Sequence, residues 1–210
     1  MTGNVTNSLI SSFLLLAPLV AQVDHQHHPP ASAEEYAKVL NDPKRNAWQK
    51  PHEVITALNL KSDETVADIG AGTGYFALRF ARHAGTVYAV DIDEKLLAMT
   101  AKNAPPNLKT VLAAPDDPKL PPQSIDTIFF CDVLHHISNR PDYYAKLLKA
   151  LKPGGRVVMI DFHKRPLPVG PGVDMKLSSE QVDAEMAASG LRKVASFDFL
   201  EYQYFNVYTR

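Results

Sequence analysis

The chain has 210 residues, 45% of them hydrophobic, so it can bury one core of ordinary size and needs no second domain. Lys and Arg total 22 against 23 Asp and Glu, and the net charge of -1 gives no general attraction to nucleic acid. The single cysteine, Cys131, excludes an intramolecular disulfide and a cysteine-rich metal site. We therefore expect one domain without a nucleic-acid partner.

An uncharged apolar run, SLISSFLLLAPLVA, occupies residues 8–21. Its length suits the hydrophobic part of a signal peptide and is below the roughly 20 residues of a membrane-spanning helix. No Lys or Arg precedes the run, which is unusual for a signal peptide. We interpret residues 1–21 as a signal peptide or membrane anchor, which slightly favours an exported (periplasmic) or membrane-anchored protein over a cytoplasmic one.

Residues 22–33 are polar, rich in His and Pro and without a hydrophobic period, which predicts a flexible linker. Clustered imidazoles such as those of His25, His27 and His28 can bind a metal ion. Histidines on a tether without fixed geometry are more often simply solvated, so we expect no metal site here.

From Glu34 onward, short β-branched runs alternate with helical stretches, a pattern typical of parallel strands joined by crossover helices. The expected strands are residues 65–69, 86–91, 108–112, 125–130 and 156–162, with a closing antiparallel hairpin of 194–199 and 202–208. The expected helices are residues 52–58, 75–83, 94–103, 141–151 and 179–189. This pattern predicts a doubly wound α/β sheet in three layers.

The segment VADIGAGTG places a buried strand directly before a glycine-rich turn. The alternate glycines Gly70, Gly72 and Gly74 let the backbone turn sharply and let a ligand approach to contact distance. Their spacing differs from the GxGxxG of a dinucleotide site, because Tyr75 stands where that pattern needs a glycine. Asp68 would repel a phosphate and attract the cationic end of S-adenosylmethionine. We therefore predict that this turn is a ligand cradle and that Asp68 can face the cationic side of such a ligand.

The next strand, VYAVD, ends on a carboxylate, that of Asp91, about 20 residues after the first glycine. A carboxylate in this place can accept hydrogen bonds from both hydroxyls of a ribose. Asp93 competes for the role, but as the residue before a helix it is more simply an N-cap. We predict that Asp91 binds the ribose and that Ile92 lies against the adenine.

A third strand leads into the segment AAPDDPKLP. At the carboxyl end of a strand beside the point where strand order reverses, a carboxylate can accept the adenine amino group. We assign that role to Asp116. The alternative is that Asp116 and Asp117 only shape a proline-rich turn, and for Asp117 we prefer this interpretation.

The segments DIGAGTG, AVDID, APDDPKLP, SIDTIFFCDVLHHI and LKALKPGGRVVMIDF stand in one order along the chain. In this order and spacing the chain resembles class I S-adenosylmethionine-dependent methyltransferases of the ubiquinone/menaquinone-methyltransferase-like group, over about residues 54–162. The resemblance implies a Rossmann-like seven-stranded sheet of order 3-2-1-4-5-7-6, its last strand antiparallel. It also implies that Asp68 and the three glycines line the methionine moiety, Asp91 the ribose and Asp116 the adenine.

The segment NAWQKP, at residues 46–51, resembles a segment that precedes the domain in small bacterial proteins of this kind and folds over the cofactor. The resemblance implies a methyltransferase domain of residues 34–210 with residues 34–51 as its N-terminal lid, and Trp48 as a cofactor contact. The alternative is that Trp48 is a hydrophobic staple for the first helix.

Methyl transfer from a sulfonium is a direct displacement, so alignment supplies much of the rate and a base is needed only for a protonated acceptor. His135 follows the fourth strand and His163 the fifth, and imidazoles take up protons near neutral pH, so these are our candidate catalytic residues. His136 has an alternative structural role, in packing or capping between the strand and the helix, and the alternative for Cys131 is a buried core thiol. The Pro/Gly-rich stretch 167–173 favours a small, partly apolar acceptor.

We therefore expect methyl transfer from S-adenosylmethionine to a small molecule, which leaves S-adenosylhomocysteine. A non-catalytic sensor or scaffold that binds the same ligand stays open, because the cofactor motifs indicate binding only. The missing GxGxxG and the closing hairpin disfavour a nicotinamide-dependent oxidoreductase. The segment CDVLHH stands where amino-methylating DNA enzymes carry an Asn/Asp-Pro-Pro-aromatic motif, which disfavours nucleobase methylation.

Overall fold

The computed structural model of the protein describes Met1 and residues 32–210. The predicted targeting segment (residues 1–21) and nearly all of the predicted linker therefore lie outside the described residues. In the part of the chain that is described, no helix has both the length and the apolar character needed to cross a bilayer.

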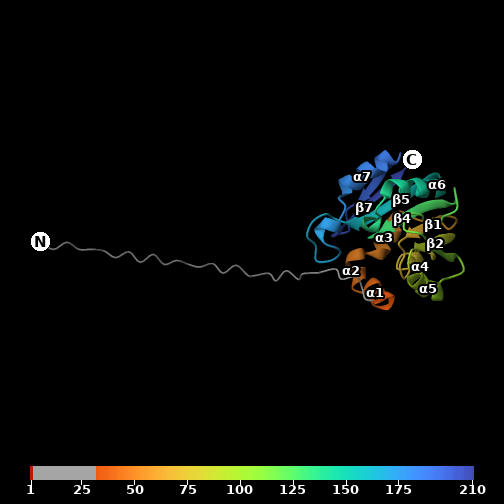
Figure 1. Cartoon of the computed structure of the whole chain (residues 1–210), viewed down its shortest axis with the longest axis horizontal. Helices are drawn as coiled ribbons and strands as arrows, with labels where there is room; N and C mark the ends of the chain where they lie inside the picture. Colours follow the sequence, from red (N-terminus) through yellow and green to blue (C-terminus); the bar gives the residue numbers. More distant parts are fainter. Residues whose placement is uncertain (2–31) are drawn as a thin grey trace.

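One sheet forms the centre of the domain, with the strand order β3-β2-β1-β4-β5-β7-β6 (Figure 1). Its strands are β1 (Thr65–Ile69), β2 (Thr86–Asp91), β3 (Leu108–Leu112), β4 (Ile125–Cys131), β5 (Leu151–Phe162), β6 (Arg192–Phe197) and β7 (Gln203–Thr209). The first five strands pair in parallel, whereas β7 is antiparallel to both β5 and β6. The predicted topology is therefore confirmed.

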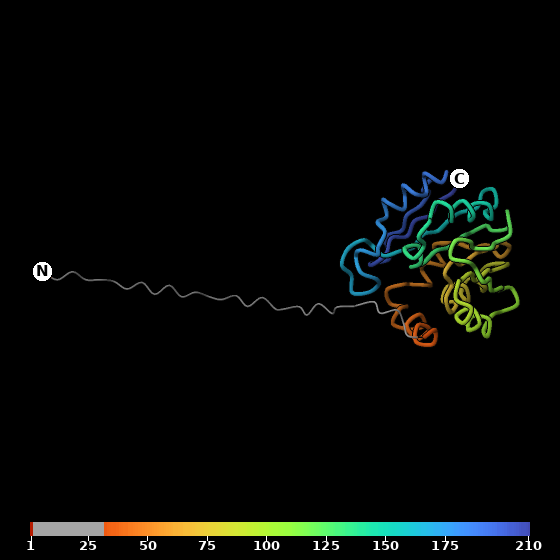
Figure 2. The backbone as a smooth tube through the Cα atoms, viewed as in Figure 1, coloured from red at the N-terminus to blue at the C-terminus, as the bar shows by residue number. Residues whose placement is uncertain are grey.

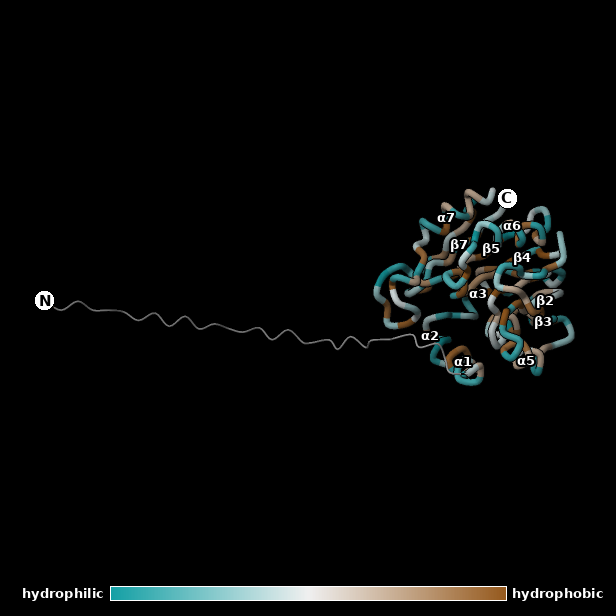
Figure 3. The backbone as a smooth tube through the Cα atoms, in the orientation of Figure 1, coloured by the Kyte–Doolittle hydropathy of each residue, from teal (hydrophilic) through white to brown (hydrophobic). Residues whose placement is uncertain are grey.

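Helices cover both faces of the sheet (Figure 1). They are α1 (Ala33–Leu40), α2 (Arg45–Gln49), α3 (Pro51–Leu58), α4 (Ala77–Phe80), α5 (Glu94–Lys102), α6 (Arg140–Ala150) and α7 (Ser179–Ala188), with short 3-10 turns η1 (Leu134–His136) and η2 (Val173–Met175). Successive residues of β1 point to opposite faces, so Val66 joins the apolar core under α3, α4 and α5, and Ala67 the core under α6 and α7. Figure 3 shows the hydrophobic segments inside the domain and hydrophilic loops around it.

Three expected elements differ in extent from the observed ones. The helix predicted at residues 75–83 is α-helical only over Ala77–Phe80, because its end is closed by i to i+3 hydrogen bonds, such as that from the His83 amide to the Phe80 carbonyl (2.8 Å). The strand β5 starts at Leu151, five residues earlier than expected, and a register shift in its pairing with β4 absorbs the Pro-Gly-Gly segment. The strand β6 lies about two residues earlier than predicted.

The order of the strands decides where a ligand can bind. The strands β1 and β4 are neighbours, but the connection after β1 leads to β2 and the connection after β4 leads to β5, so the two leave in opposite directions along the sheet. Figure 2 traces the backbone through these connections. At such a point a crevice opens beyond the carboxyl ends of the strands. The glycine-rich turn after β1 and the loops after β2 and β4 all border that crevice.

The turn after β1 requires glycine for two reasons. Gly70 has a φ of +72°, a conformation that other residues adopt only with strain. A Cβ at Gly70 would also lie 2.4 Å from the Cγ2 of Val133, in the loop after β4. The first glycine therefore lets two loops pack against each other at the floor of the crevice, in addition to any approach of a ligand.

Replacing Gly70 by Ala is expected to lower the free energy of unfolding by about 3 kcal/mol, since backbone strain and overpacking each contribute about 1–3 kcal/mol. Gly190→Ala is the matched control, because Gly190 has a φ of +82° but no atom within 4 Å of an added Cβ. That variant should lose only the strain contribution, about 1 kcal/mol. Urea unfolding of the ligand-free full chain measures both, and equal losses would contradict the proposed packing.

Candidate active site

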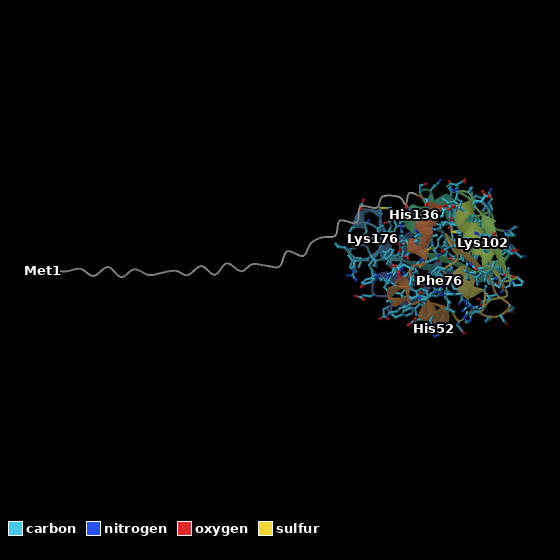
Figure 4. All side chains as sticks on the ribbon, turned by 90° about the horizontal axis from the view of Figure 1, so that it is seen from below. Met1, His52, Phe76, Lys102, His136 and Lys176 are labelled. Atoms are coloured by element: carbon cyan, nitrogen blue, oxygen red, sulfur yellow. The ribbon has the colours of Figure 1, made fainter. Side chains whose placement is uncertain are left out.

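A cavity of about 590 Å³ opens at the carboxyl ends of β1, β2 and β4. Figure 4 labels His136 and Phe76, two of the residues that line it. Among the residues predicted from the sequence, the wall includes Trp48, Asp68, Gly70, Gly72, Asp91, Ile92 and His135. Its volume lies in the range of small-ligand sites, about 300–1,000 Å³.

The charges of the wall are mainly negative. Four carboxylates line the cavity, those of Asp68, Asp91, Asp93 and Asp132, and among the described residues Arg45 is the only lysine or arginine that does so. A wall of this composition attracts a positively charged ligand and repels a phosphate.

The carboxyl group of Asp68 is buried in the wall, at 3% exposure, where β1 ends. Burial raises the pKa of Asp68 to about 8, although a hydrogen bond from the backbone of Ala77 and the charge of Arg45 act in the opposite direction. A cation beside this carboxyl group would favour its ionised form. The group is therefore suited to an ammonium or sulfonium that enters the cavity.

The carboxylate of Asp91 is held in place by two backbone amides. Its Oδ2 accepts a hydrogen bond from the Gly72 N–H (2.7 Å), and its Oδ1 accepts one from the Asp93 N–H (2.9 Å). A carboxylate has about four acceptor positions, so two remain for a ligand. Asp93 accepts from the amides of Lys95 and Leu96 and caps α5, as predicted, and Ile92 is 61% exposed at the cavity mouth.

Three predicted site residues do not line the cavity. Asp116 is turned outward, with 74% of its side chain exposed and a 2.9 Å ion pair with Lys146, and the wall at this point is formed by residues 113–115. Gly74 lies behind the turn, where an added Cβ would come within 2.8 Å of the Thr100 side chain. His163 lies beyond the end of β5 with its ring 6.2 Å from that of Tyr204. Spacing along the chain predicted that these residues lie near the site, but it could not predict whether they face the cavity.

The N-terminal segment, α1 and α2, packs directly on the glycine-rich turn. The Cδ1 of Leu40 lies 2.8 Å from the position of a Cβ on Gly72. The Thr73 hydroxyl donates to Asn41 Oδ1 (2.8 Å), and the Tyr75 hydroxyl donates to Asn46 Oδ1 (2.6 Å). This part of the chain therefore forms one side of the cavity.

Trp48, in α2, lines the cavity and lies 5.8 Å, ring to ring, from Phe162 at the end of β5. This contact runs across the site to the far half of the sheet, which differs from the expectation for a staple that only pins the first helix. The two rings give that end of the cavity an apolar wall.

A buried polar network that was not predicted from the sequence connects α2 to β7 and to the residue after β4. Arg45 lies 3.6 Å from the Asp132 carboxylate after β4 and donates to Gln49 Oε1 (3.2 Å). The Gln49 amide donates to Gln203 (2.8 Å), which in turn donates to Asp132 (2.5 Å). Burial raises the pKa of Asp132 to about 6, partly opposed by Arg45. Gln49 and Gln203 are 154 residues apart, so no local sequence pattern predicts their contact.

His135, in η1, is paired with a carboxylate that the sequence analysis did not select. Its Nδ1 lies 3.1 Å from both carboxylate oxygens of Asp161, in β5, and the two side chains are only 3% and 2% exposed. The ring of His136 lies 4.2 Å from that of His135.

Burial raises the pKa of the Cys131 thiol well above its usual range, so this thiol in the cavity wall is a poor nucleophile.

Comparison with known proteins finds similarity to methyltransferases. The sequence profile of a family described as "Methyltransferase domain" matches residues 67–159. A demethylmenaquinone methyltransferase of Streptomyces avermitilis is 30% identical over 152 residues, which is 68% of this chain and 64% of that protein. Phosphoethanolamine N-methyltransferase 1 of Arabidopsis thaliana is 28% identical over 121 residues, which is 54% of this chain and 24% of that protein. The chain spans less than two thirds of the length of these relatives.

Solved structures share the fold. A SAM-dependent methyltransferase from Aquifex aeolicus superposes with a TM-score of 0.78 and 23% identity, covering 84% of this chain and 97% of that one. The DhpI–SAH complex gives a TM-score of 0.68 with 19% identity, covering 84% and 90%. Residues 67–159 therefore match the methyltransferase-domain family, and the domain as a whole has the fold of S-adenosylmethionine-dependent methyltransferases.

Proposed function

We propose that the protein transfers a methyl group from S-adenosylmethionine to a small-molecule acceptor, with S-adenosylhomocysteine as the second product. The observation that carries this proposal is Asp91, whose carboxylate is fixed by the amides of Gly72 and Asp93 and keeps acceptor capacity for a ribose. The relatives support a small acceptor, because their names specify demethylmenaquinone and phosphoethanolamine.

The residues of the wall fit this ligand along its length. Asp91 would hold the ribose and Ile92 would cover the adenine. At the other end, Asp68 would face the ammonium group and Arg45 the carboxylate, while the turn at Gly70 keeps the backbone close. When bound, S-adenosylmethionine supplies an electrophilic methyl group, and the chain aligns the acceptor with it.

The acceptor would lie in the half of the cavity bordered by Trp48, Phe162 and His135. The two aromatic rings offer an apolar surface there, and the imidazole offers a group that can take up a proton. No feature of this half favours the non-catalytic alternative, since a sensor needs no imidazole paired with a buried carboxylate. The lid role of residues 34–51 is part of the proposal, supported by the packing of Leu40 on the turn.

Asp91→Ala in the full chain is expected to weaken binding of S-adenosylhomocysteine at least about 100-fold, because two hydrogen bonds to a charged group contribute about 1.5–3 kcal/mol each. Asp117→Ala is the matched control, since Asp117 only accepts from the Lys119 amide (2.8 Å) in its turn. Isothermal titration calorimetry measures the affinities. Wild-type affinity in Asp91→Ala, or no binding by folded wild-type protein, would contradict the proposal.

Asp116→Ala tests the adenine role predicted from the sequence. Because the carboxylate is exposed and paired with Lys146, we expect an affinity for S-adenosylhomocysteine within about threefold of wild type. A loss as large as that in Asp91→Ala would show that the side chain turns inward on binding and would restore the predicted role.

Binding of S-adenosylhomocysteine at pH 7 is expected to release a proton from Asp68. With a pKa of about 8, the free carboxyl group is mostly protonated at this pH, and the ligand's ammonium favours the carboxylate. Affinity should therefore rise from pH 6 to pH 8. Calorimetry in two buffers of different ionisation enthalpy measures the release, which Asp68→Asn should abolish. Proton uptake by the wild type would contradict the assignment.

We also propose that residues 1–21 direct export or tether the domain to a membrane, on the basis of their apolar run. Full-length protein should be found in the membrane or periplasmic fraction of bacterial cells, and protein lacking residues 1–31 in the cytoplasmic fraction. The same distribution for both would contradict this proposal.

A further inference from the structure

We infer that Asp161 positions His135 as the general base of the reaction, and that the acceptor is consequently a small molecule whose nucleophilic atom carries a proton. The inference rests on the proposed function and narrows it, because methyl transfer to a thioether or a tertiary amine needs no base.

The geometry of the pair is the first argument. Both oxygens of Asp161 lie 3.1 Å from His135 Nδ1, so the ring is held by the whole carboxylate. Asp161 Oδ1 also accepts from the Phe162 N–H (2.8 Å), which ties the carboxylate to the backbone at the end of β5. With side-chain exposures of 3% and 2%, neither group has much freedom to turn away.

This pairing determines which ring nitrogen of His135 can accept a proton from a ligand. An ionised carboxylate only accepts hydrogen bonds, so the hydrogen of the neutral imidazole belongs on Nδ1 and the lone pair on Nε2. His135 lines the cavity between β1, β4 and the aromatic pair Trp48 and Phe162. Nε2 is therefore the nitrogen left to receive a proton from a ligand there.

The chemistry balances without a further reactant. The acceptor atom forms its bond to the methyl carbon while the bond from that carbon to sulfur breaks. The proton of the acceptor atom passes to His135 Nε2, and the carboxylate of Asp161 stabilises the imidazolium. Solvent removes the proton after the products leave.

Other titratable and charged groups face this pair and have to be considered in any pH profile. They are Asp132 after β4 with Arg45 beside it, Cys131 at the end of β4, His136 on η1, Tyr204 on β7 and Lys176 after η2. Asp132 matters most, because burial raises its pKa to about 6, where a histidine also titrates. An Asp132→Asn background removes this ambiguity.

The first arm of the test needs no acceptor. In the full chain with ¹⁵N-labelled histidine, NMR at high pH should show His135 protonated on Nδ1, with the signal assigned by its loss in His135→Gln. Asp161→Asn should shift the population toward the Nε2-protonated form, whereas Asp183→Asn, a control at the carboxylate that accepts from Tyr208, should not. A wild-type ring protonated on Nε2 would overturn the inference.

The second arm separates a positioning role from a purely structural one. Radiolabelled S-adenosylmethionine is offered with matched acceptors, a thiol and its methyl thioether, a phenol and its methyl ether, and a secondary and a tertiary amine. We expect transfer only to the members that carry a proton. His135→Gln should lower kcat at least about 100-fold and Asp161→Asn at least about tenfold. The acid limb of the Asp161→Asn pH profile should move to lower pH.

The outcomes distinguish a failure of the proposed function from a failure of the inference about His135 and Asp161. Failure of wild-type protein to bind S-adenosylhomocysteine would refute the proposed function itself. If binding is normal, three results would overturn the inference alone. They are equal transfer to the proton-free acceptors, an unshifted pH profile in Asp161→Asn, and no transfer to any proton-bearing acceptor. Affinity for S-adenosylhomocysteine within about threefold of wild type in His135→Gln and Asp161→Asn shows that the variants are folded.

Discussion

The hydrogen bond from the Gly72 amide to the Asp91 carboxylate, at 2.7 Å, is the contact on which the rest of the site depends. It joins the turn after β1 to the end of β2, and the amide of Gly70 reinforces it by donating to the Val90 carbonyl (2.8 Å). Leu40 packs on the same turn from the N-terminal side, and Val133 from the side of β4. The sides of the cavity formed by β2, by the N-terminal segment and by the loop after β4 are therefore positioned relative to this turn.

The cofactor half of the site could be predicted from the sequence because its signals are local. Asp68 and Asp91 lie on two strands that pair with each other, and Gly70 and Gly72 lie in the turn directly after the first, so chain order and pairing together fix their arrangement. The residues that could not be predicted depend on distant partners. Asp161 pairs with His135, 26 residues away, and the outward orientation of Asp116 goes with its ion pair to Lys146, 30 residues away.

The two halves of the cavity differ in the kind of interaction that holds them. Around the turn, backbone amides and close packing fix the geometry, which suits one invariant ligand. Around the acceptor half, the wall is made of side chains on α2, η1 and the end of β5, joined by the network of Arg45, Asp132 and Gln203. Such a wall can be altered by substitution without changing the fold, which separates acceptor choice from cofactor binding.

A crystal structure of the full chain with S-adenosylhomocysteine would test the central claim most directly. We predict that the ligand lies across the carboxyl ends of β1 and β2, with both ribose hydroxyls on Asp91, its ammonium group near Asp68 and its sulfur facing the half of the cavity that contains His135. A ligand bound elsewhere, or with its ribose away from Asp91, would contradict it.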